Sequence, residues 1–379
     1  MSRVLAINAG SSSVKFAVFT TDEAPRELLR GHVDGTGADA RLFVDGAERD
    51  LAGGVALRPM PIILGVLEAS HDDHDITVVS HRIVHGGAEF THPEFLTPDV
   101  MEKLTALEPL APLHQPHDLA IVRDAMAVFP DAAQVGCFDT AFHAGKPLEA
   151  NCYALPRALY AEGVRRYGFH GLSYDYISGA LRARHPDLAR GRVVIAHLGS
   201  GASLAAVVDG VSVATTMGFS ALDGLPMGTR TGDLDPGVLL YLMDQKGMDS
   251  AALSQFLYKK CGLLGLSGIS NDMRVLEASA APEADEAITY ATYRVRREIG
   301  AMAAAMGGID GIVFTGGIGE NSVRVRSEVL AGLEFLGFAL DAAANAAKAG
   351  SIGGAGKPVL VMPTNEEVVI ARGAVAKRL

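Results

Sequence analysis

Short apolar runs alternate along this chain with longer segments in which apolar residues recur at helical spacing. Residues 4–7 and 14–19 are almost continuously apolar, which is typical of strands buried on both faces. Further strands are expected at 76–80, 134–138, 193–196, 204–208, 309–314 and 359–362. Helices are expected at 116–129, 174–183, 236–243, 250–259 and 286–306, with another after residue 321. Strands that alternate with helices in this way predict an α/β fold.

Two strand–turn–strand units in this pattern resemble each other. The first has its turn at residues 8–13, and the second at residues 197–203. When the two turns are superposed, Gly10 falls on Gly199 and Ser11 on Ser200, about half the chain apart. The spacing indicates a duplicated domain. Ligands of open α/β sheets gather at the carboxyl ends of strands, where these glycine-rich turns lie.

Length and charge narrow the class of protein. A chain of 379 residues favours two domains over one. Its 33 basic and 44 acidic residues give a net charge of −11, and it has no Trp, so a broad nucleic-acid surface is not expected. An acidic chain still binds anions where a few Arg and Lys side chains converge.

The cysteines and the start of the chain indicate a cytoplasmic protein. Cys137, Cys152 and Cys261 form no CxxC pair and no zinc pattern, which favours free thiols in a reducing compartment. The first residues hold too short an apolar run for a secretory signal, which needs about 7–15 apolar residues. No run approaches the roughly 18 apolar residues of a membrane span, so no membrane association is expected.

Small residues in the first turn are suited to phosphate. Residues 8–15 offer backbone N–H groups, hydroxyls and Lys15 to an anion, although glycine–serine sequences also form ordinary hairpin turns. No GxxxxGK[ST] sequence is present, so this is not a Walker A loop. A second glycine-rich segment, 315–321, ends a strand and opens a helix, which suits the close approach of a nucleotide.

Charged residues cluster in three further segments. Arg82 follows an apolar strand and is a candidate clamp for an anionic substrate. His81 and His85 have the spacing of a helical metal pair, but the strand and the following glycines argue against a helix there. Asp139 ends another strand, where a helix N-cap is the alternative role. Residues 218–235 hold Arg230 in a loop rich in Gly and Pro, which indicates a rigid support for charge.

Together these segments closely resemble the acetate kinase family, in the group of actin- and hexokinase-like phosphotransferases. The chain carries Asn-Ala-Gly-Ser-Ser-Ser-x-Lys at 8–15 and Met-Gly-x-x-x-Leu-x-Gly-Leu-x-Met-Gly-Thr-Arg at 217–230. It also carries His-Arg-x-Val-His-Gly-Gly, Phe-Asp-Thr-Ala-Phe-His, Tyr-Gly-Phe-His-Gly, Asn-Asp-Met-Arg, Gly-Gly-Ile-Gly-Glu-Asn and Thr-Asn-Glu-Glu in the family's order. The resemblance runs from residue 4 to about 371.

The resemblance implies a role for each matching residue. Asp139, His170 and Arg230 are the expected catalytic residues, and Arg82, Val84, Leu113 and Phe169 the expected acetate contacts. Asn8 and Glu366 are expected to hold or support Mg²⁺, with Mn²⁺ as an alternative. The expected ATP or ADP contacts are Ser11, Ser13, Lys15, His197, Leu198, Gly199, Ser200, Gly201, Asp272, Met273, Arg274, Gly317, Ile318, Gly319, Glu320 and Asn321.

The resemblance also implies a fold and an assembly. The expected fold is a duplicated ribonuclease H-like, actin/hexokinase-like pair of domains, each with a central mixed sheet flanked by helices. Residues 1–146 with 368–379 form the first expected domain, and residues 147–367 form the second, which binds nucleotide and dimerises. The active site is expected in the cleft between the domains, and the protein is expected to be a homodimer.

The chemistry of such a reaction is mainly a problem of charge. A carboxylate with a pKa of about 4–5 is already ionised at neutral pH, so Asp139 is expected to position magnesium or substrate rather than remove a proton. Arginine, histidine, lysine and Mg²⁺ would neutralise the two anions that meet. Direct in-line transfer from ATP to the acid, giving an acyl phosphate, is the expected mechanism.

The chain departs from the family pattern at four positions. Ser200 replaces an Asn of the phosphate loop, so that contact weakens or passes through water. Leu172 and Tyr174 replace the Thr and His that usually flank Ser173, which changes the packing beside His170. Ala221 stands where members often have Pro, which would admit propionate if that position lines the methyl pocket.

Three alternatives therefore remain open at the level of sequence. A propionate or butyrate kinase would use the same chemistry. A pyrophosphate-dependent relative would need no nucleotide, but the segments around Asp272 and 317–321 favour one. A nucleotide-binding protein without turnover would have no use for Arg82, His170 and Arg230 together.

Overall fold

The computed structural model describes residues 2–10, 13–35, 40–49, 59–70 and 75–378. The chain forms two compact units. Unit 1 comprises Met1–Ala144 and the C-terminal segment Asn365–Leu379, and unit 2 comprises Gly145–Thr364. The sequence-based domain limits, at 146 and 368, remain predictions, as do the roles given to the two domains.

Unit 1 is built on a mixed sheet of eight described strands, in the order β5-β4-β3-β2-β1-β6-β8-β7. β1 pairs antiparallel with β2 and parallel with β6, which in turn pairs parallel with β8. The apolar residues 4–7 are fully buried at the centre of β1, as a strand covered on both faces requires. The strands are β1 (Ser2–Ala9), β2 (Ser13–Thr20), β3 (Glu27–Asp34), β4 (Arg41–Val44), β5 (Ala47–Arg49), β6 (Asp75–Ile83), β7 (Glu94–Phe95) and β8 (Ala133–Phe138).

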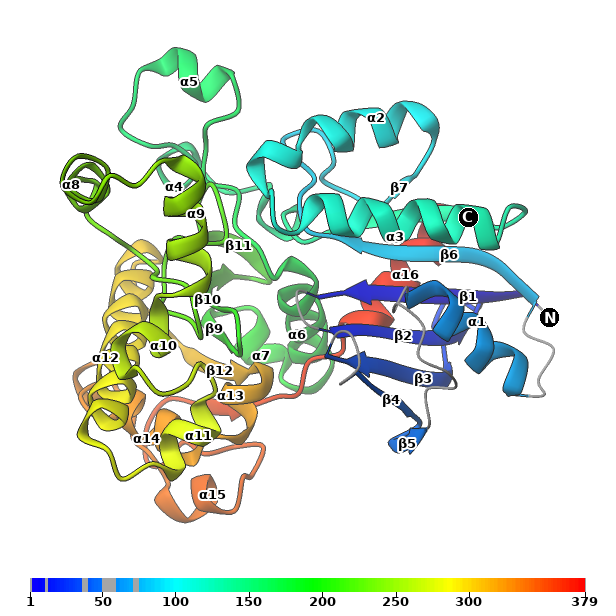
Figure 1. Ribbon diagram of the computed structural model, residues 1–379. Coiled ribbons are helices and arrows are strands. Elements are labelled where there is room, and N and C mark those ends of the chain that lie inside the picture. Colours follow the sequence, from blue (N-terminus) through cyan, green and yellow to red (C-terminus); the bar gives the residue numbers. More distant parts are fainter. Residues whose placement is uncertain (1, 11–12, 36–39, 50–58, 71–74, 379) are drawn as a thin grey trace. The chain divides into compact units, whose positions relative to one another are not determined.

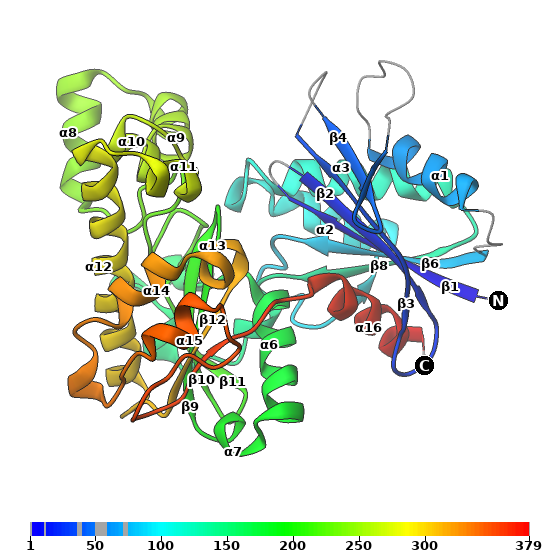
Figure 2. The same ribbon diagram turned by 90° about the horizontal axis from the view of Figure 1, so that it is seen from below.

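Helices cover both faces of this sheet. Figure 2 shows α16 on one face, and α1 and α3 on the other. α16 packs against β1, β2, β6 and β8, so the C-terminal segment completes the core of unit 1. The helices of unit 1 are α1 (Pro59–Ala69), α2 (Pro98–Ala106), α3 (Gln115–Val128) and α16 (Glu366–Arg378), with 3-10 turns at Glu108–Leu110 and Ala141–His143.

Unit 2 repeats the central part of that topology. Its described sheet has the order β11-β10-β9-β12-β13, in which β9 pairs antiparallel with β10 and parallel with β12. The order β3-β2-β1-β6-β8 of unit 1 has the same pattern of antiparallel and parallel neighbours. The strands are β9 (Arg192–Leu198), β10 (Ala202–Val208), β11 (Val211–Thr215), β12 (Gly311–Thr315) and β13 (Val359–Val361). The predicted duplicated α/β fold, with two mixed sheets flanked by helices, is confirmed.

The helices of unit 2 pack on both sides of its sheet. Figures 1 and 2 show α12 on one side and α6 on the other. These helices are α4 (Leu148–Asn151), α5 (Arg157–Ala161), α6 (Gly171–Arg184), α7 (Pro186–Ala189), α8 (Pro236–Lys246), α9 (Ser250–Lys259), α10 (Gly262–Ser267), α11 (Met273–Ala278), α12 (Pro282–Ala305), α13 (Gly316–Asn321), α14 (Val323–Leu330) and α15 (Ala342–Ala346), with a 3-10 turn at Glu334–Leu336.

The predicted elements are present, and their ends differ by a few residues. α12 begins at Pro282 rather than 286, because proline is pre-organised for the first turn of a helix and needs no N–H there. α6 begins at Gly171 rather than 174, directly after His170. The hairpin strands β3 to β5 carry little continuous apolar sequence and were missed, since pairing with β2 rather than local pattern makes them strands.

Candidate active site

Three strand ends of unit 1 meet at the side chain of Arg82. Arg82 lies near the end of β6, and its Nε and Nη2 donate to Oδ2 of Asp139 at 2.9 and 2.5 Å. Its Nη1 donates to the carbonyl of Ala9, at the end of β1, at 2.6 Å. The Arg82 side chain is 13% exposed and that of Asp139 only 1%. Asp139 follows β8 and therefore orients the guanidinium rather than capping a helix.

Charge around Arg82 keeps the guanidinium ionised. Burial alone opposes its charge, but the carboxylates of Asp139 and Glu366 raise the pKa of Arg82 above its ordinary value. A third carboxylate, Asp118 on α3, also lies near this group and accepts the backbone N–H of Val84 at 2.9 Å. Asp118 is buried, and this burial raises the pKa of its carboxyl to about 7. No sequence motif marks Asp118.

A second group of oxygen atoms lies at the start of α16. Nδ2 of Asn8 donates to Oε2 of Glu366 and to Oε1 of Glu367, each at 2.9 Å. Arg30 on β3 donates to the other oxygen of Glu367 at 3.0 Å. The link joins the end of β1 to the C-terminal helix. Glu367, which no separate sequence signal marks, pairs with Arg30 and is buried, and Glu366 is the more exposed of the two carboxylates.

The other residues predicted in unit 1 have simpler surroundings. Lys15 is exposed on β2 opposite Asn8, and Ser13 begins that strand half-buried. Ser11 lies outside the described residues. Val84 is buried beside the Arg82 strand, whereas Leu113 is half-buried before α3. His81 lies within β6 and contacts Gln134 at 2.8 Å, and no metal-binding group of three His, Cys, Asp or Glu side chains occurs among the described residues.

Unit 2 presents two imidazoles stacked on each other. The ring centroids of His170 and His197 are 4.4 Å apart, with 24° between the planes. Nδ1 of His170 contacts Oγ of Ser203 at 2.8 Å, and Nδ1 of His197 contacts Oγ of Ser173 at the same distance. His170 has a φ of 58°, in the left-handed region that non-glycine residues seldom adopt, and such strain is common at functional positions. Phe169, beside it, is fully buried.

A glycine-rich loop passes next to these imidazoles. A Cβ atom built on Gly201 would lie 3.1 Å from Nε2 of His170 and 3.8 Å from Nη2 of Arg230. One built on Gly199 would lie 3.9 Å from the backbone N of Gly317 and 4.0 Å from Nε2 of His197. Arg230 is held in place by the carbonyl of Ala221, to which it donates at 3.1 Å. The structure thus brings predicted residues of three other segments, at His170, Arg230 and Gly317, close to this loop.

Around that loop the individual side chains differ in exposure. Leu198 is buried, and Ser200 is exposed while its carbonyl accepts the N–H of Gly228 at 3.3 Å. In α13, Gly317 and Asn321 are exposed, and Ile318 and Glu320 are half-buried. Gly319 is buried. Oε1 of Glu320 accepts the N–H of Gly316 at 3.0 Å, so it closes the first turn of α13.

The segment 272–274 begins α11. Asp272 caps the helix and pairs with Arg274 at 2.6 Å, while Met273 is buried. The Arg274 side chain is 89% exposed, and Asp272 is partly exposed, so these two polar side chains are accessible. The buried Met273 supports the helix and does not itself face solvent.

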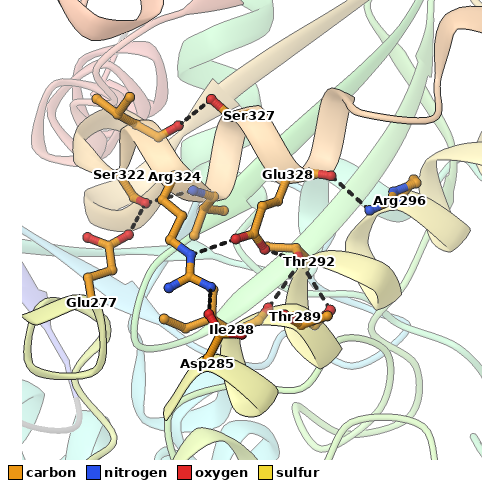
Figure 3. A network of polar contacts seen from close by, with 12 residues as sticks. Glu277, Asp285, Ile288, Thr289, Thr292, Arg296, Ser322, Arg324, Ser327 and Glu328 are labelled. Carbon is orange, nitrogen blue, oxygen red and sulfur yellow. Dashed lines mark hydrogen bonds and ion pairs between the residues drawn. The ribbon is translucent and has the colours of Figure 1, made fainter. Parts of the chain in front are cut away.

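A polar network links the two predicted nucleotide segments (Figure 3). Ser322, which caps α14 just after α13, donates to Glu277 on α11. On α14, Arg324 pairs with Glu328 at 2.5 Å and with Asp285 on α12. Glu328 in turn accepts from Thr292 of α12 at 2.9 Å. The ends of α11 and α13 are therefore fixed relative to each other within unit 2.

Some residues of this site carry no sequence signal. Ser173 and Ser203 sit in different elements, α6 and β10, and only the fold brings each to a histidine. Ser203 lies opposite His197 in the β9–β10 ladder, in a register that local sequence does not encode. Ser173 lies two residues after the Tyr-Gly-Phe-His-Gly motif, between Leu172 and Tyr174.

Gly-rich turns beside arginine and histidine side chains, at strand ends of two mixed sheets, define an α/β enzyme that handles anionic substrates. Residues 3–372 match the model of the Acetokinase family. The chain belongs to that family.

Curated relatives and solved structures agree with that assignment. The chain is 48% identical over 384 residues to the acetate kinase of Nitrobacter hamburgensis, covering 98% of this chain and 95% of that protein. It is also 48% identical to the acetate kinase of Methylocella silvestris, covering 99% and 98%. The Porphyromonas gingivalis acetate kinase structure is 37% identical, with a TM-score of 0.88 and full coverage of both chains. A propionate kinase from Francisella tularensis is 34% identical, with a TM-score of 0.90 over 98% of this chain and 99% of that one.

The buried carboxyl of Asp118 should make stability depend on pH. Its folded pKa of about 7 lies above the ordinary 3.8, so the stability it contributes at low pH is lost as pH rises through about 7. Asp118→Asn keeps an oxygen acceptor for Val84 but cannot ionise. Relative to the parent chain, this variant should gain free energy of unfolding between pH 4 and 7, by at most about 4 kcal/mol.

Urea denaturation of both chains across that pH range measures the difference. Asp131→Asn, at an exposed carboxylate beyond the same helix, is the matched control and should leave the difference flat. A constant offset between parent and Asp118→Asn at every pH would contradict the assignment of a raised pKa.

Proposed function

We propose that this chain is an acetate kinase, which transfers the γ-phosphoryl group of ATP reversibly to acetate and forms acetyl phosphate and ADP. The observation that carries the proposal is the near full-length similarity to acetate kinases, at 48% identity. The side chains around Arg82 in unit 1 and those around His170 in unit 2 are proposed to supply the charges that this reaction requires. The transfer is proposed to be direct and in line, without a phosphorylated enzyme.

Arg82 is the proposed carboxylate clamp. A guanidinium has five N–H donors, and the described residues Asp139 and Ala9 accept from three of them. The remaining donors lie on Nη1 and Nη2, which can bind a carboxylate in a bidentate manner. Asp139 is proposed to hold Arg82 in that orientation. Val84 and Leu113 are the proposed apolar contacts of the acetate methyl group, with Phe169 as the third.

The imidazoles and Arg230 of unit 2 are proposed to contact the transferring phosphoryl group. His170 and Arg230 approach the same glycine, Gly201, whose lack of a side chain leaves room for phosphate oxygens. Because charge spreads over the equatorial oxygens during transfer, donors fixed beforehand stabilise the transition state. His197, Gly199, Gly317 and the start of α11 would then contact the remainder of the nucleotide.

Magnesium is proposed at Asn8 and Glu366. Mg²⁺ prefers oxygen ligands and is commonly held by one or two carboxylates together with substrate phosphates and water. The half-buried Glu366, oriented by the Asn8 amide, fits that donor set. When bound, the ion neutralises phosphate charge, and Mn²⁺ would serve in the same way. Lys15, on the strand opposite Asn8, adds a positive charge from the protein.

Propionate is the alternative acid. The similarity to a propionate kinase structure and the small Ala221 side chain both favour acceptance of one more carbon. Butyrate and pyrophosphate are less well supported, the latter because both nucleotide segments are intact. Free thiols at Cys137, Cys152 and Cys261 suit the reducing cytoplasm proposed for the enzyme. None of the described helices is both long and apolar enough to cross a membrane.

A hydroxylamine trap for acyl phosphate tests the function directly. The purified chain with Mg²⁺ should form acetyl phosphate from acetate and ATP, with little product when pyrophosphate replaces ATP. Relative kcat/KM for acetate, propionate and butyrate should fall with chain length if the methyl pocket is small. Absence of trapped product with all three acids would refute the proposed reaction.

Conservative substitutions distinguish the roles proposed for Arg82 and Arg230. Arg82→Lys should raise KM for acetate because a lysine cannot bind a carboxylate with two parallel N–H bonds. Arg230→Lys should mainly lower kcat, by about 10²–10³-fold, the usual loss on removing a preorganised donor. Steady-state kinetics with both substrates measure the difference.

Arg41→Lys is the control for these two variants. Arg41 forms an ion pair with Glu48 at 2.5 Å on the edge of the same sheet as Arg82, and both side chains are exposed. Its replacement should leave both constants unchanged. If Arg82→Lys and Arg230→Lys behaved like Arg41→Lys, the roles proposed for Arg82 and Arg230 would be wrong.

A homodimer is proposed through α8. None of the residues of this helix is buried, and Leu240 and Tyr241 are 61% and 52% exposed. Tyr293, on another helix of unit 2, α12, is likewise 54% exposed. Clusters of exposed apolar side chains are uncommon on monomers and mark interaction surfaces, and a second copy is the partner that the family resemblance implies.

Leu240→Asp should convert the dimer to a monomer, because a carboxylate buried at an apolar interface is costly to desolvate. Light scattering after size-exclusion chromatography measures the mass. Phe335→Asp is the matched control, since Phe335 is 79% exposed on a different surface turn, and it should leave the mass unchanged. An unchanged mass for Leu240→Asp would place the interface elsewhere, and a monomeric parent chain would refute the dimer.

A further inference from the structure

Behind His170 lies a chain of hydroxyl groups that the proposed reaction does not use. Tyr174 lies in the first turn of α6, four residues after His170, which directly precedes the helix. Oγ of Ser203, on β10, lies 2.8 Å from Nδ1 of His170 and 2.5 Å from the phenol oxygen of Tyr174. Ser203 and Tyr174 are both fully buried. A single serine oxygen therefore bridges a phenol and an imidazole inside the core.

The chemistry of the three groups determines which of them donates in each hydrogen bond. Burial raises the pKa of Tyr174 well above its ordinary value, so the phenol keeps its proton. A phenol O–H is a better donor than an aliphatic hydroxyl, and therefore Tyr174 donates to Ser203. The proton of Ser203 is then available to Nδ1 of His170. Hydrogen bonds aligned in one direction polarise and strengthen one another.

A hydrogen bond accepted at Nδ1 of His170 determines whether Nε2 carries the proton. In a neutral imidazole one nitrogen carries the proton and the other accepts, and the partner of one fixes the state of the other. If Nδ1 accepts from Ser203, Nε2 carries the proton. Nε2 is the atom that a Cβ on Gly201 would approach to 3.1 Å, so the N–H faces the glycine loop.

The charges around His170 favour its neutral form. The ring stacks on that of His197 at 4.4 Å, and Nη2 of Arg230 approaches the same Gly201 position. If His170 were protonated, its imidazolium would lie near the guanidinium of Arg230 and the ring of His197, and it would meet like-charge repulsion from Arg230. A neutral ring that still donates from Nε2 avoids this repulsion.

We propose that Tyr174 and Ser203 are positioning residues that hold His170 as the neutral Nε2–H tautomer, with that N–H directed at the Gly199–Gly201 loop. The inference rests on the proposed function for the identity of the anion, a phosphoryl group, but not for the tautomer itself. Tyr174 is one of the departures from the family pattern. The arrangement gives a physical reason for the strained backbone of His170, which places Nδ1 against Ser203.

Ring-nitrogen NMR of the chain labelled with ¹⁵N-histidine tests the tautomer, and His170→Asn identifies the His170 signals. The parent chain should show a protonated Nε2 and an unprotonated Nδ1 at neutral pH. In Ser203→Ala this pattern should be lost, and kcat should fall about 10- to 100-fold, as when outer partners of functional histidines are removed. KM for ATP and acetate should stay within about two-fold, because positioning of a transition-state donor affects kcat.

Tyr174→Phe removes only the phenol oxygen and should shift the tautomer and kcat in the same direction by a smaller factor. Tyr167→Phe is the matched control: Tyr167 is a buried tyrosine of unit 2 whose hydroxyl donates to the carbonyl of Gly163 at 2.7 Å. It should change neither the His170 signals nor kcat. If Ser203→Ala does not fold, the parent spectrum and the Tyr174→Phe variant still test the proposed tautomer of His170.

Two results would overturn the inference. One is a parent spectrum with His170 doubly protonated or protonated at Nδ1. The other is a set of variants in which Ser203→Ala and Tyr174→Phe both leave the His170 signals and kcat unchanged. The same conclusion follows if Tyr167→Phe changes the signals and lowers kcat as much as they do. A parent chain that forms no acyl phosphate would refute the proposed function alone, since the NMR result does not depend on turnover.

Discussion

The buried ion pair between Arg82 and Asp139 is the interaction on which unit 1 depends. Through it the ends of β1, β6 and β8 are joined, because Arg82 also donates to the carbonyl of Ala9. Breaking a buried pair by removing one partner typically costs about 3–5 kcal/mol, since the other charge is left without compensation. The same pair fixes the guanidinium in one orientation. Structural integrity and a directed positive charge are thus obtained from one contact, and the carboxylates of Asp118 and Glu366 lie close enough to keep that charge.

Unit 2 orients its donor side chains with neutral groups. Its sheet repeats the central strand order of unit 1, and its first turn carries Gly199 where unit 1 has Gly10. Serine hydroxyls, rather than carboxylates, orient the two imidazoles beside that turn. Because a hydroxyl bears no charge, it fixes a ring without drawing it toward the cationic state. The two halves of a duplicated fold therefore position donors by different means, an ion pair in one and a hydroxyl chain in the other.

Much of the site could be predicted from sequence because its residues follow strands or occupy motifs. Arg82, Asp139 and the 197–201 loop each stand at the end of an apolar run, and strand ends collect ligands in this fold class. Asp118 and Ser203 could not be found in this way. Each lies within a helix or strand whose pattern is accounted for by packing, and each acts on a residue more than thirty positions away in sequence.

The sequence alone determined the α/β class, the repeated strand–turn–strand unit and the ordered motifs of the family, since these depend on local pattern and spacing. Tertiary structure alone decided which side chains meet. The contact between Ser203 and His170 and the hydrogen bond that Arg30 donates to Glu367 join distant segments, and such contacts depend on strand order and register that no local pattern encodes. The protonation of buried groups such as Asp118 was decided there too, because desolvation depends on what the folded chain packs around them.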